Sequence, residues 1–428
     1  MTPPSLAIDL GAAFTKLAFR PQDDFPTNLL RHNSLNLDAF RMCVPSVAAQ
    51  DTQSGRWVYG MDAMDLQNRG SIEVYRNWKP CLFAPREENA TPKSVRPFAW
   101  KEKPGAKQDE ASLLRDYSQD QALDVAARYL RWLLEEMIPT MLGHHLPDEV
   151  ETQLCVPDFA LQNASESTWT RLMQEAGFHS SDGFLVSEPL SNLVGVLTRG
   201  RNLMNDQGLP DVGRLFPDLV ETEEDFFLID VGAYTADFAL VRFSSLLHRT
   251  PEEGSTGSAP LGLKVLDDLV RQRSSEGVRS ALEAMPASGW ERLHSTLYGG
   301  ATLFGQTDSW EVEYGISVEG DIVDACLDDY AQSVVKEAYQ FLGKQEGHAI
   351  RAAVLTGGGN NLPRFAGRIA EKLFEQGIST FYLGDSVPPP EGVIPFGLSQ
   401  HLIRGASAVG AASVMFAQHQ PQREALAS

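Results

Sequence analysis

The sequence has few cysteines, a deficit of basic residues and no long apolar run. The four cysteines, Cys43, Cys81, Cys155 and Cys326, lie far apart and form no C-x-x-C pair, which argues against a structural zinc site and fits a reducing compartment. No stretch is long and apolar enough to span a bilayer, and the N-terminus has no basic region followed by an apolar run. These absences predict a cytoplasmic protein that does not enter a membrane.

Positive charge is scarce, since 36 Lys and Arg stand against 57 Asp and Glu, for a net charge of −21. Such a surface repels nucleic acid backbones and anionic membranes, so neither is an expected partner. A phosphate ligand would therefore have to be held by backbone N–H groups and a cation. The chain has 428 residues, of which 43% are hydrophobic and 22% charged, as in globular proteins of two or three domains.

Two segments of the chain, residues 6–19 and 227–240, resemble each other. Each has an apolar run, an Asp-x-Gly sequence, small or hydroxyl residues and a second apolar run, which predicts a strand, a tight turn and a second strand. One such hairpin opens each half of the chain, so the repeat indicates a duplicated two-lobe protein. The matched residues are Ile8, Asp9, Gly11, Ala12 and Ala18 with Ile229, Asp230, Gly232, Ala233 and Ala239.

Hydrophobic periodicity predicts strands followed by helices in both halves, which is typical of an α/β fold. Further strands are expected at residues 57–59, 153–157, 183–187 and 352–356. Helices are expected at residues 122–142, 165–176, 190–197, 261–273, 322–342, 362–376 and 405–417.

The predicted domain organisation is a first lobe, an acidic connection, a second lobe and a short tail. These parts span residues 1–200, 201–225, 226–417 and 418–428. Residues 79–110 are rich in Pro, Lys and Glu and are expected to form a surface insertion in the first lobe. Residues 252–260 are expected to form an exposed Gly/Ser loop, and the acids at 221–225 a solvated connection.

An Asp at the end of a strand, followed by Gly, suits a metal–phosphate site. Asp9 and Asp230 could supply oxygens for Mg²⁺, which keeps most of its waters, while the glycine turns bring backbone N–H groups to the phosphates. One such turn alone is more simply a plain hairpin turn. Two matched turns that face each other would grip a phosphate chain from both sides, and the repeat therefore favours a site.

A third glycine element follows the apolar run at residues 352–356. Gly357, Gly358 and Gly359 leave bare backbone on which a flat adenosine could lie. They could also form a tight strand-to-helix turn, with Asn360 or Asn361 capping the next helix. The two interpretations are compatible.

Together these elements resemble the actin, heat-shock-70 and sugar-kinase superfamily, and most closely the heat-shock-70 nucleotide-binding domain. The two Asp-x-Gly turns resemble its phosphate motifs, and residues 357–359 its adenosine motif. The resemblance implies two ribonuclease-H-like lobes with an actin-like ATPase fold and a central nucleotide cleft. Weaker matches occur in the same order along nearly the whole chain, at residues 44–47, 59–63, 156–159, 187–190, 261–267 and 404–410.

The resemblance also implies roles for individual residues. Asp9 and Asp230 would hold Mg²⁺, and Glu188 would orient the attacking water, with Asp237 beside it and Pro157 relaying the conformational change. Thr235 would contact the γ-phosphate. The remaining nucleotide-binding residues would be Gly11, Ala12, Ala13, Thr15, Lys16, Gly232, Ala233, Tyr234, Gly357, Gly358, Gly359 and Arg364. From the residues alone, Glu188 could equally be a solvated acid at a helix start.

The sequence departs from the family at several of these positions. Ala12 and Ala13 replace threonines that contact phosphate, and Ala233 and Tyr234 replace glycines of the second turn. Met64 stands where the family's catalytic lysine is expected, and Lys16 or Lys79 are the candidates to substitute in space. These departures are compatible with nucleotide binding and argue against efficient hydrolysis.

Several functions are compatible with the motifs. The first is a heat-shock-70-like protein that binds ATP or ADP with Mg²⁺, as a slow ATPase or a nucleotide-gated switch read by a protein partner. Residues 418–428 leave no room for a peptide-binding domain, so chaperone action on unfolded peptides is not expected. The alternatives are an actin-like filament protein, a small-molecule kinase, and a scaffold that has kept the fold without turnover.

Overall fold

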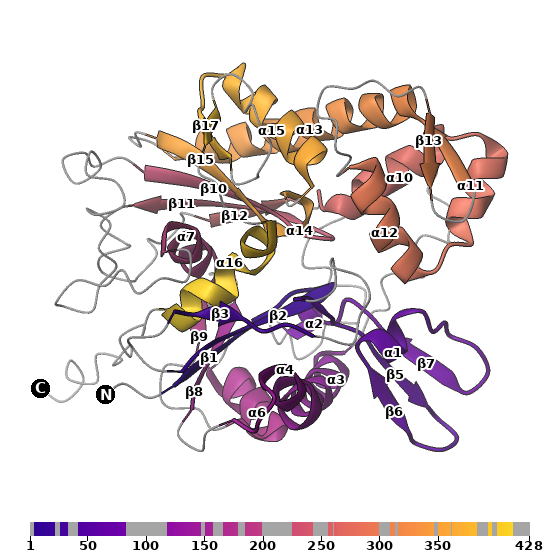
Figure 1. The fold of residues 1–428 in the computed structure, drawn as a ribbon, viewed down its shortest axis with the longest axis vertical. Coiled ribbons are helices and arrows are strands. Elements are labelled where there is room, and N and C mark those ends of the chain that lie inside the picture. Colours follow the sequence, from indigo (N-terminus) through magenta and orange to yellow (C-terminus); the bar gives the residue numbers. More distant parts are fainter. Residues whose placement is uncertain are drawn as a thin grey trace, which may run out of the picture.

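The computed structural model forms two mixed β-sheets, one above the other, with helices around them (Figure 1). It describes residues 4–21, 26–32, 42–82, 118–146, 150–156, 166–178, 185–198, 225–242, 256–259, 261–298, 309–312, 316–345, 350–360, 362–382, 393–395 and 400–413. The predicted α/β class is confirmed. Within these ranges no helix combines the length and apolarity needed to cross a bilayer.

The first sheet has the order β3-β2-β1-β8-β9, with β4 beside β2. β1 and β2 form the predicted antiparallel hairpin, whereas β8 and β9 run parallel to β1. All residues of β1 are buried, because helices cover both faces of the sheet. The strands are β1 (Ser5–Leu10), β2 (Phe14–Arg20), β3 (Asn28–Leu29), β4 (Val44–Pro45), β8 (Glu151–Val156) and β9 (Leu185–Ser187).

The second sheet has the order β12-β11-β10-β15-β16-β17. β10 and β11 form the second predicted hairpin, β12 extends it antiparallel, and β15, β16 and β17 run parallel to β10. In both sheets the hairpin therefore supplies the central strand, with an antiparallel edge on one side and parallel strands on the other. The strands are β10 (Asp225–Val231), β11 (Ala236–Arg242), β12 (Thr256–Ala259), β15 (Ile350–Thr356), β16 (Thr380–Tyr382) and β17 (Val393–Pro395).

Helices α3 and α6 cover one face of the first sheet. α3 (Gln119–Trp132) begins with a complete capping box, in which Ser118 and Gln121 exchange side-chain bonds with each other's backbone N–H. It continues through a π-helical segment at Leu133–Met137 into α4 (Ile138–Leu142), so the helix predicted at 122–142 is interrupted. α6 (Glu166–Ala176) packs beside α3.

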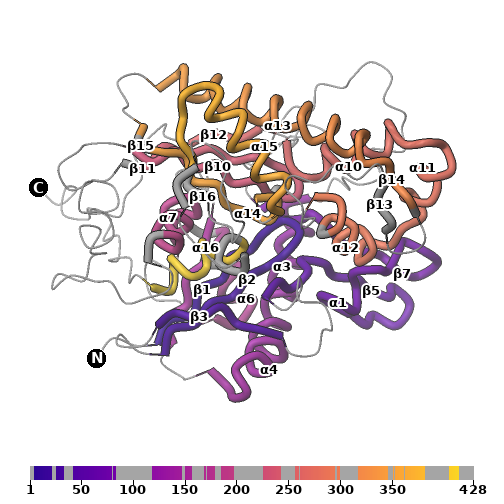
Figure 2. The backbone as a smooth tube through the Cα atoms, turned by 45° about the horizontal axis from the view of Figure 1, so that its top comes forward, coloured from indigo at the N-terminus to yellow at the C-terminus, as the bar shows by residue number. Residues whose placement is uncertain are grey.

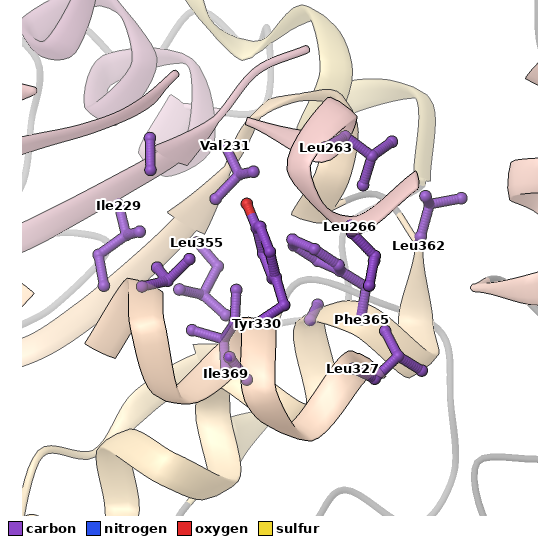
Figure 3. Close-up of a cluster of buried hydrophobic side chains, with 14 of the residues drawn as sticks. Ile229, Val231, Leu263, Leu266, Leu327, Tyr330, Leu355, Leu362, Phe365 and Ile369 are labelled. Atoms are coloured by element: carbon purple, nitrogen blue, oxygen red, sulfur yellow. The ribbon is translucent and has the colours of Figure 1, made fainter. Parts of the chain in front are cut away.

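The core of the second half lies between its sheet and helices α10, α13 and α15 (Figure 3). The ring of Tyr330 lies near the side chains of Val231 and Phe365, and its plane is tilted by 42° to the Phe365 ring at a centroid distance of 5.2 Å. The helices are α10 (Leu263–Arg273), α11 (Glu276–Glu283), α12 (Ala287–Leu297), α13 (Gly320–Leu342), α14 (Gly357–Asn360) and α15 (Pro363–Phe374).

Two helices, α7 (Glu188–Thr198) and α16 (Gln400–Ser413), cross each other between the sheets (Figures 1 and 2). The backbones touch at two glycines. A Cβ on Gly195 would lie 1.9 Å from the carbonyl oxygen of Ala406, and one on Gly410 would lie 1.8 Å from that of Ser191. α16 packs on β1 and β2, so the prediction that 226–417 belong wholly to the second lobe is wrong for this helix.

A small sheet at the far end of the first half lies near α12 of the second half (Figure 1). It has the order β6-β5-β7 and is flanked by the short helix α1. Asp65, which follows α1, accepts hydrogen bonds from the backbone N–H of Ser288 (2.9 Å) and its hydroxyl (2.6 Å). The two halves therefore touch at this end as well as at the helix crossing. The elements are β5 (Ala48–Asp51), β6 (Trp57–Tyr59), α1 (Met61–Met64) and β7 (Ile72–Tyr75), and the second half has a further hairpin of β13 (Ser309–Val312) and β14 (Ile316–Glu319).

Several sequence-based boundaries were wrong. Lys79 does not begin a surface insertion, because Lys79–Leu82 form helix α2 and Lys79 and Leu82 are buried. Asp225 is not part of a solvated connection but a buried residue of β10. Residues 256–259 form the edge strand β12 instead of an exposed loop. Predictions for residues 83–110, Pro157, 201–224 and 418–428 lie outside the described residues.

Candidate functional site

A pocket between the two halves is lined by all three glycine elements. The two hairpin turns, each at the end of a central strand, approach it from opposite sheets, and the turn after β15 closes a further side. Most of the residues selected from the sequence meet here. Those that line the pocket are Asp9, Gly11, Ala12, Ala13, Lys16, Glu188, Asp230, Gly232, Ala233, Tyr234, Thr235, Asp237, Gly357, Gly358 and Gly359.

The turn of the first hairpin is held by backbone contacts. A Cβ on Gly11 would lie 2.3 Å from the carbonyl oxygen of Phe14, so only glycine allows this turn to be so tight. Ser46 fixes the turn from the side, because its hydroxyl donates to the Gly11 carbonyl (2.7 Å) and its N–H to that of Ala13 (2.8 Å). Thr15 bonds Ser46 through its buried hydroxyl (3.0 Å) and is not among the pocket-lining residues, so the structure does not place this predicted nucleotide-binding residue in the pocket.

The turn of the second hairpin docks on the start of helix α10. The carbonyls of Gly232 and Ala233 accept from the N–H groups of Leu263 and Lys264, both at 3.0 Å. Those N–H groups lie in the first turn of the helix and have no intrahelical partner, so the two elements satisfy each other. Tyr234 does not have a positive φ, and this turn therefore needs no glycine at its position.

Asp9 is a buried carboxylate at the end of β1. Its Oδ2 accepts from Lys16 Nζ (3.1 Å), directly opposite in the hairpin, and from Ser407 Oγ (2.6 Å) on α16. Burial opposes ionisation, but Lys16 and Lys79 outweigh it and lower the pKa of Asp9. Its Oδ1 is buried and has no hydrogen-bond partner among the described residues.

Asp230 occupies the equivalent place at the end of β10. Its Oδ2 accepts from Asn192 Nδ2 (2.9 Å) on α7 and from Thr356 Oγ1 (3.0 Å) on β15. The residue opposite in the hairpin is Asp237 rather than a lysine. Burial raises the pKa of Asp230 to about 6, and the negative charge of Asp237 adds to the effect.

Glu188 begins helix α7 and forms an ion pair with Lys79 of α2, with Oε2 and Nζ 3.2 Å apart. Ser187 caps the helix by accepting from the N–H of Leu190 (3.2 Å). Burial raises the pKa of Glu188 to about 7, although Lys79 counteracts it. Glu188 is thus a partly buried, lysine-paired carboxyl group and not a fully solvated acid.

Met64 occupies the sequence position of the family's catalytic lysine, but two other lysines, Lys16 and Lys79, line the pocket. Met64 is buried and does not belong to the pocket lining, whereas Lys16 and Lys79 do. Asn77 precedes this segment with a φ of 52°, the left-handed conformation that Asn tolerates better than most residues. The bend it makes accompanies burial of Trp78 in the core and of Lys79 at the pocket.

The turn after β15 closes tightly on the second hairpin. Gly357 has a φ of +90°, and a Cβ on it would lie 2.4 Å from Asp230 Oδ1. Asn360 ties the turn down, since its Nδ2 donates to the carbonyls of Ile229 (3.1 Å) and Thr356 (2.7 Å). Asn360 therefore anchors this turn through backbone carbonyls rather than by capping the N-terminus of the next helix.

Arg364 does not lie where the sequence predicted. It is buried on α15, pairs with Asp324 and donates from Nη1 to the carbonyl of Leu297 (3.1 Å). It is absent from the pocket lining, so the structure does not place this predicted nucleotide-binding residue in the pocket. The partners available in the folded core, which sequence position does not reveal, determine where this guanidinium points.

Sequence reasoning missed Glu291 and His294, which bring helix α12 to the pocket. His294 Nε2 donates to both oxygens of buried Asp267 (2.9 and 3.0 Å), which also accepts from Tyr298 Oη (3.1 Å). Burial lowers the pKa of His294, but Asp267 outweighs it and raises the pKa to about 10. The only sequence signal was that Glu291 and His294 are three residues apart on one helix, and such a spacing is common on packed helices. Arg404 and Ser407 of α16 also line the pocket and were missed.

The carboxylates that line the pocket limit which divalent cation could bind there. Among the described residues no group of three His, Cys, Asp or Glu side chains gathers closely enough to hold a metal alone. Asp9 and Asp230 both line the pocket, and Asp9 Oδ1 is a buried acceptor without a partner in that part of the chain. The residues therefore fit a cation that keeps several waters and takes few protein ligands, which is the behaviour of Mg²⁺.

No protein-family model and no curated protein matches this chain.

Proposed function

We propose that this chain binds ATP or ADP with Mg²⁺ in the pocket between its two halves, as an ATP-binding protein of the actin and heat-shock-70 type. The observation that carries the proposal is the meeting of Asp9 and Asp230, which come from matched hairpins in different sheets, in one pocket. When bound, Mg²⁺ would neutralise phosphate charge, and Asp9 and Asp230 would hold it.

The strand order supports the fold part of the proposal. An antiparallel β-hairpin that supplies the central strand, followed by parallel strands on the other side, occurs in both sheets. This arrangement is what two ribonuclease-H-like lobes of an actin-like ATPase require. The crossing helices α7 and α16 would then be the connection about which the lobes turn.

The pocket's cations support a phosphate ligand. Lys16 and Lys79 both line it, each paired with one carboxylate, in a chain with a net charge of −21. Ammonium groups and backbone N–H groups of glycine turns are the donors expected around phosphate oxygens. Glu188, with a pKa raised to about 7, is the candidate to orient a water for attack, with Thr235 and Asp237 nearby in the second hairpin.

Calorimetric titration with ATP and ADP, with and without Mg²⁺, tests the proposal. Binding should depend on Mg²⁺ and weaken at least tenfold in Asp9→Asn and Asp230→Asn, because each loses a carboxylate that would hold the ion. Asp62→Asn, an exposed residue of α1, is the matched control and should bind normally. A wild-type chain that ignores adenine nucleotides would refute the proposal.

Binding without hydrolysis is the second candidate, and Ala12 and Ala13 favour it. Both line the pocket, and neither can donate a hydroxyl hydrogen bond to phosphate. The protein would then be a scaffold or switch whose closed form a partner protein reads. Phosphate release measured with saturating Mg²⁺–ATP separates the two: steady release supports a slow ATPase, and tight binding without release supports the scaffold.

A further inference from the structure

We infer that Asn192 and Ser407 are positioning residues that tie the two pocket carboxylates to the helix crossing, and so couple ligand binding to the angle between the halves. The inference deepens the proposed function and rests on it. Each residue is buried at 2% exposure, and each donates to one of the two aspartates.

The two bonds run from opposite halves of the chain. Asp9 lies in the first sheet and is held by Ser407 of the last helix, α16. Asp230 lies in the second sheet and is held by Asn192 of α7, which directly follows the first sheet's last strand. The Asn192 bond therefore joins the second sheet to a helix that follows the first sheet. The Ser407 bond joins Asp9 to α16, which packs on the first sheet and against α7 at the crossing.

The helices that carry these donors cannot slide past each other freely. Gly195 and Gly410 place the two backbones in direct contact, within about one helical turn of Asn192 and Ser407. A change in the angle between the sheets must be absorbed at this crossing, because α7 and α16 make more extensive contact with each other than any other pair of elements. Rotation of either helix would move its donor relative to the carboxylate.

A cation bound by both Asp9 and Asp230 would act directly on the hydrogen bonds that Ser407 and Asn192 donate to them. A side chain that only orients a ligand group typically changes metal affinity by about tenfold or more when it is lost. The coupling acts in both directions, since a crossing angle that favours the bound carboxylate geometry must also be favoured by the bound cation.

The test uses Mn²⁺ in place of Mg²⁺, because its binding is followed by electron paramagnetic resonance without any turnover. The variants are Asn192→Leu, which keeps the approximate side-chain size and loses the donor without adding charge, and Ser407→Ala. Each should weaken Mn²⁺ binding about tenfold, with or without ADP. Ser407→Thr, which keeps the hydroxyl, should recover most of the affinity.

Hydrogen exchange measures the coupling itself. In wild type, Mn²⁺–ADP should increase amide protection in α7 and α16, and both donor-deleted variants should lose that increase while their ligand-free far-UV spectra stay unchanged. Ser191→Ala is the control for α7, since Ser191 is adjacent and buried and its hydroxyl has no hydrogen-bond partner among the described residues. Ser413→Ala is the control for α16 and removes a buried hydroxyl that bonds Thr27.

The outcomes separate this inference from the proposed function. Variants that bind Mn²⁺ as wild type does, or a Ser407→Thr protein as weak as Ser407→Ala, would overturn the inference and leave nucleotide binding standing. Unchanged protection at the crossing on ligand binding would also overturn it. A wild-type chain that binds neither Mn²⁺ nor ADP would overturn both.

Discussion

The two hairpins share a backbone but differ in charge. In the first, Asp9 stands opposite Lys16, and in the second, Asp230 stands opposite Asp237. The pKa of Asp9 is lowered, because lysines outweigh burial, whereas burial and Asp237 raise the pKa of Asp230 to about 6. The residue on the opposite strand, Lys16 in one hairpin and Asp237 in the other, therefore helps to shift the pKa values of two equivalent aspartates in opposite directions.

This difference in charge gives the two aspartates different requirements for a cation. The first aspartate is already compensated by a fixed cation, so it is a stable anchor for Lys16 beside the pocket. The second lies beside Asp237 and, under the proposed function, would gain most from a bound cation. The matched hairpins therefore give both aspartates the same backbone position, while the residue opposite each one, Lys16 or Asp237, sets the local charge.

Removal of Lys16 should make the first hairpin resemble the second and should have the largest effect on the free energy of unfolding. Lys16→Met leaves Asp9, whose side chain is 2% exposed, without its nearest cation and should cost about 4 kcal/mol in the free energy of unfolding. Urea denaturation measures the change, and the double variant Lys16→Met/Asp9→Asn should regain more than half of it. Lys372→Met, which breaks the half-exposed pair with Glu375, should cost less than about 1 kcal/mol. Equal losses in the two single variants would show that Asp9 needs no fixed cation.

A third carboxylate, buried Asp267, extends the comparison, because it has a cationic partner in the second half. The pKa of His294 is raised to about 10 by Asp267, above its ordinary 6.5, so the pair's stabilisation is complete below about pH 6.5 and is lost as pH rises through about 10. His294→Gln should lower stability at pH 6 by about 3 kcal/mol and flatten its decline between pH 7 and 10. Thermal unfolding across this range measures both, with exposed His144→Gln as the control. A slope equal to that of wild type would contradict the assignment.

Neutralising Asp237 should make the second hairpin less unlike the first. Burial raises the pKa of Asp237 to about 6, as it does that of Asp230, so both carboxyls destabilise the fold increasingly as pH rises from about 4 through about 6. Asp237→Asn should therefore gain about 2 kcal/mol at pH 8 and nothing at pH 4, measured by urea unfolding at the two pH values. A gain that is independent of pH would point to packing instead of charge.

The contact between the halves at their far end should give the smallest effect. Pro286 precedes α12 and offers no side-chain cap, so Asp65 of the first half caps this helix from the other half of the chain. Asp65→Ala should cost about 1 kcal/mol of stability and should speed release of a fluorescent nucleotide, because α12 lines the pocket. Stopped-flow displacement measures the release rate, and Asp62→Ala on α1 is the control. Unchanged release would separate this contact from the pocket.

Much of the fold was predictable from local patterns. Both hairpins, the buried strand at 350–356 and the long helix α13 follow from apolar periodicity and from the Asp-x-Gly repeat. The short strands β12, β16 and β17 were not predicted, because three or four residues carry little periodic signal and depend on pairing with a neighbour. No pattern in the sequence indicated the π-helical segment that follows α3 at Leu133–Met137.

The site divides in the same way. Asp9, Asp230 and the three glycine elements were found because repeats and turn chemistry are written locally in the chain. No local pattern connects Asn192, His294 and Ser407 to the site, whereas Lys79, one of the two lysines expected to substitute in space, does reach the pocket from α2. Thr15 and Arg364 were misplaced, because residues distant in sequence, Ser46 and Asp324, bind their side chains elsewhere.

The sequence by itself determined the two hairpins, their glycine turns and the alternation of strands and helices, since each depends on neighbours a few residues away. Only the tertiary structure decided which charges meet. It set Lys79 beside Glu188, Ser407 beside Asp9 and Asn192 beside Asp230, through the crossing of α7 and α16. Buried polar groups must find partners wherever the packed chain brings them, and packing is a property of the whole chain.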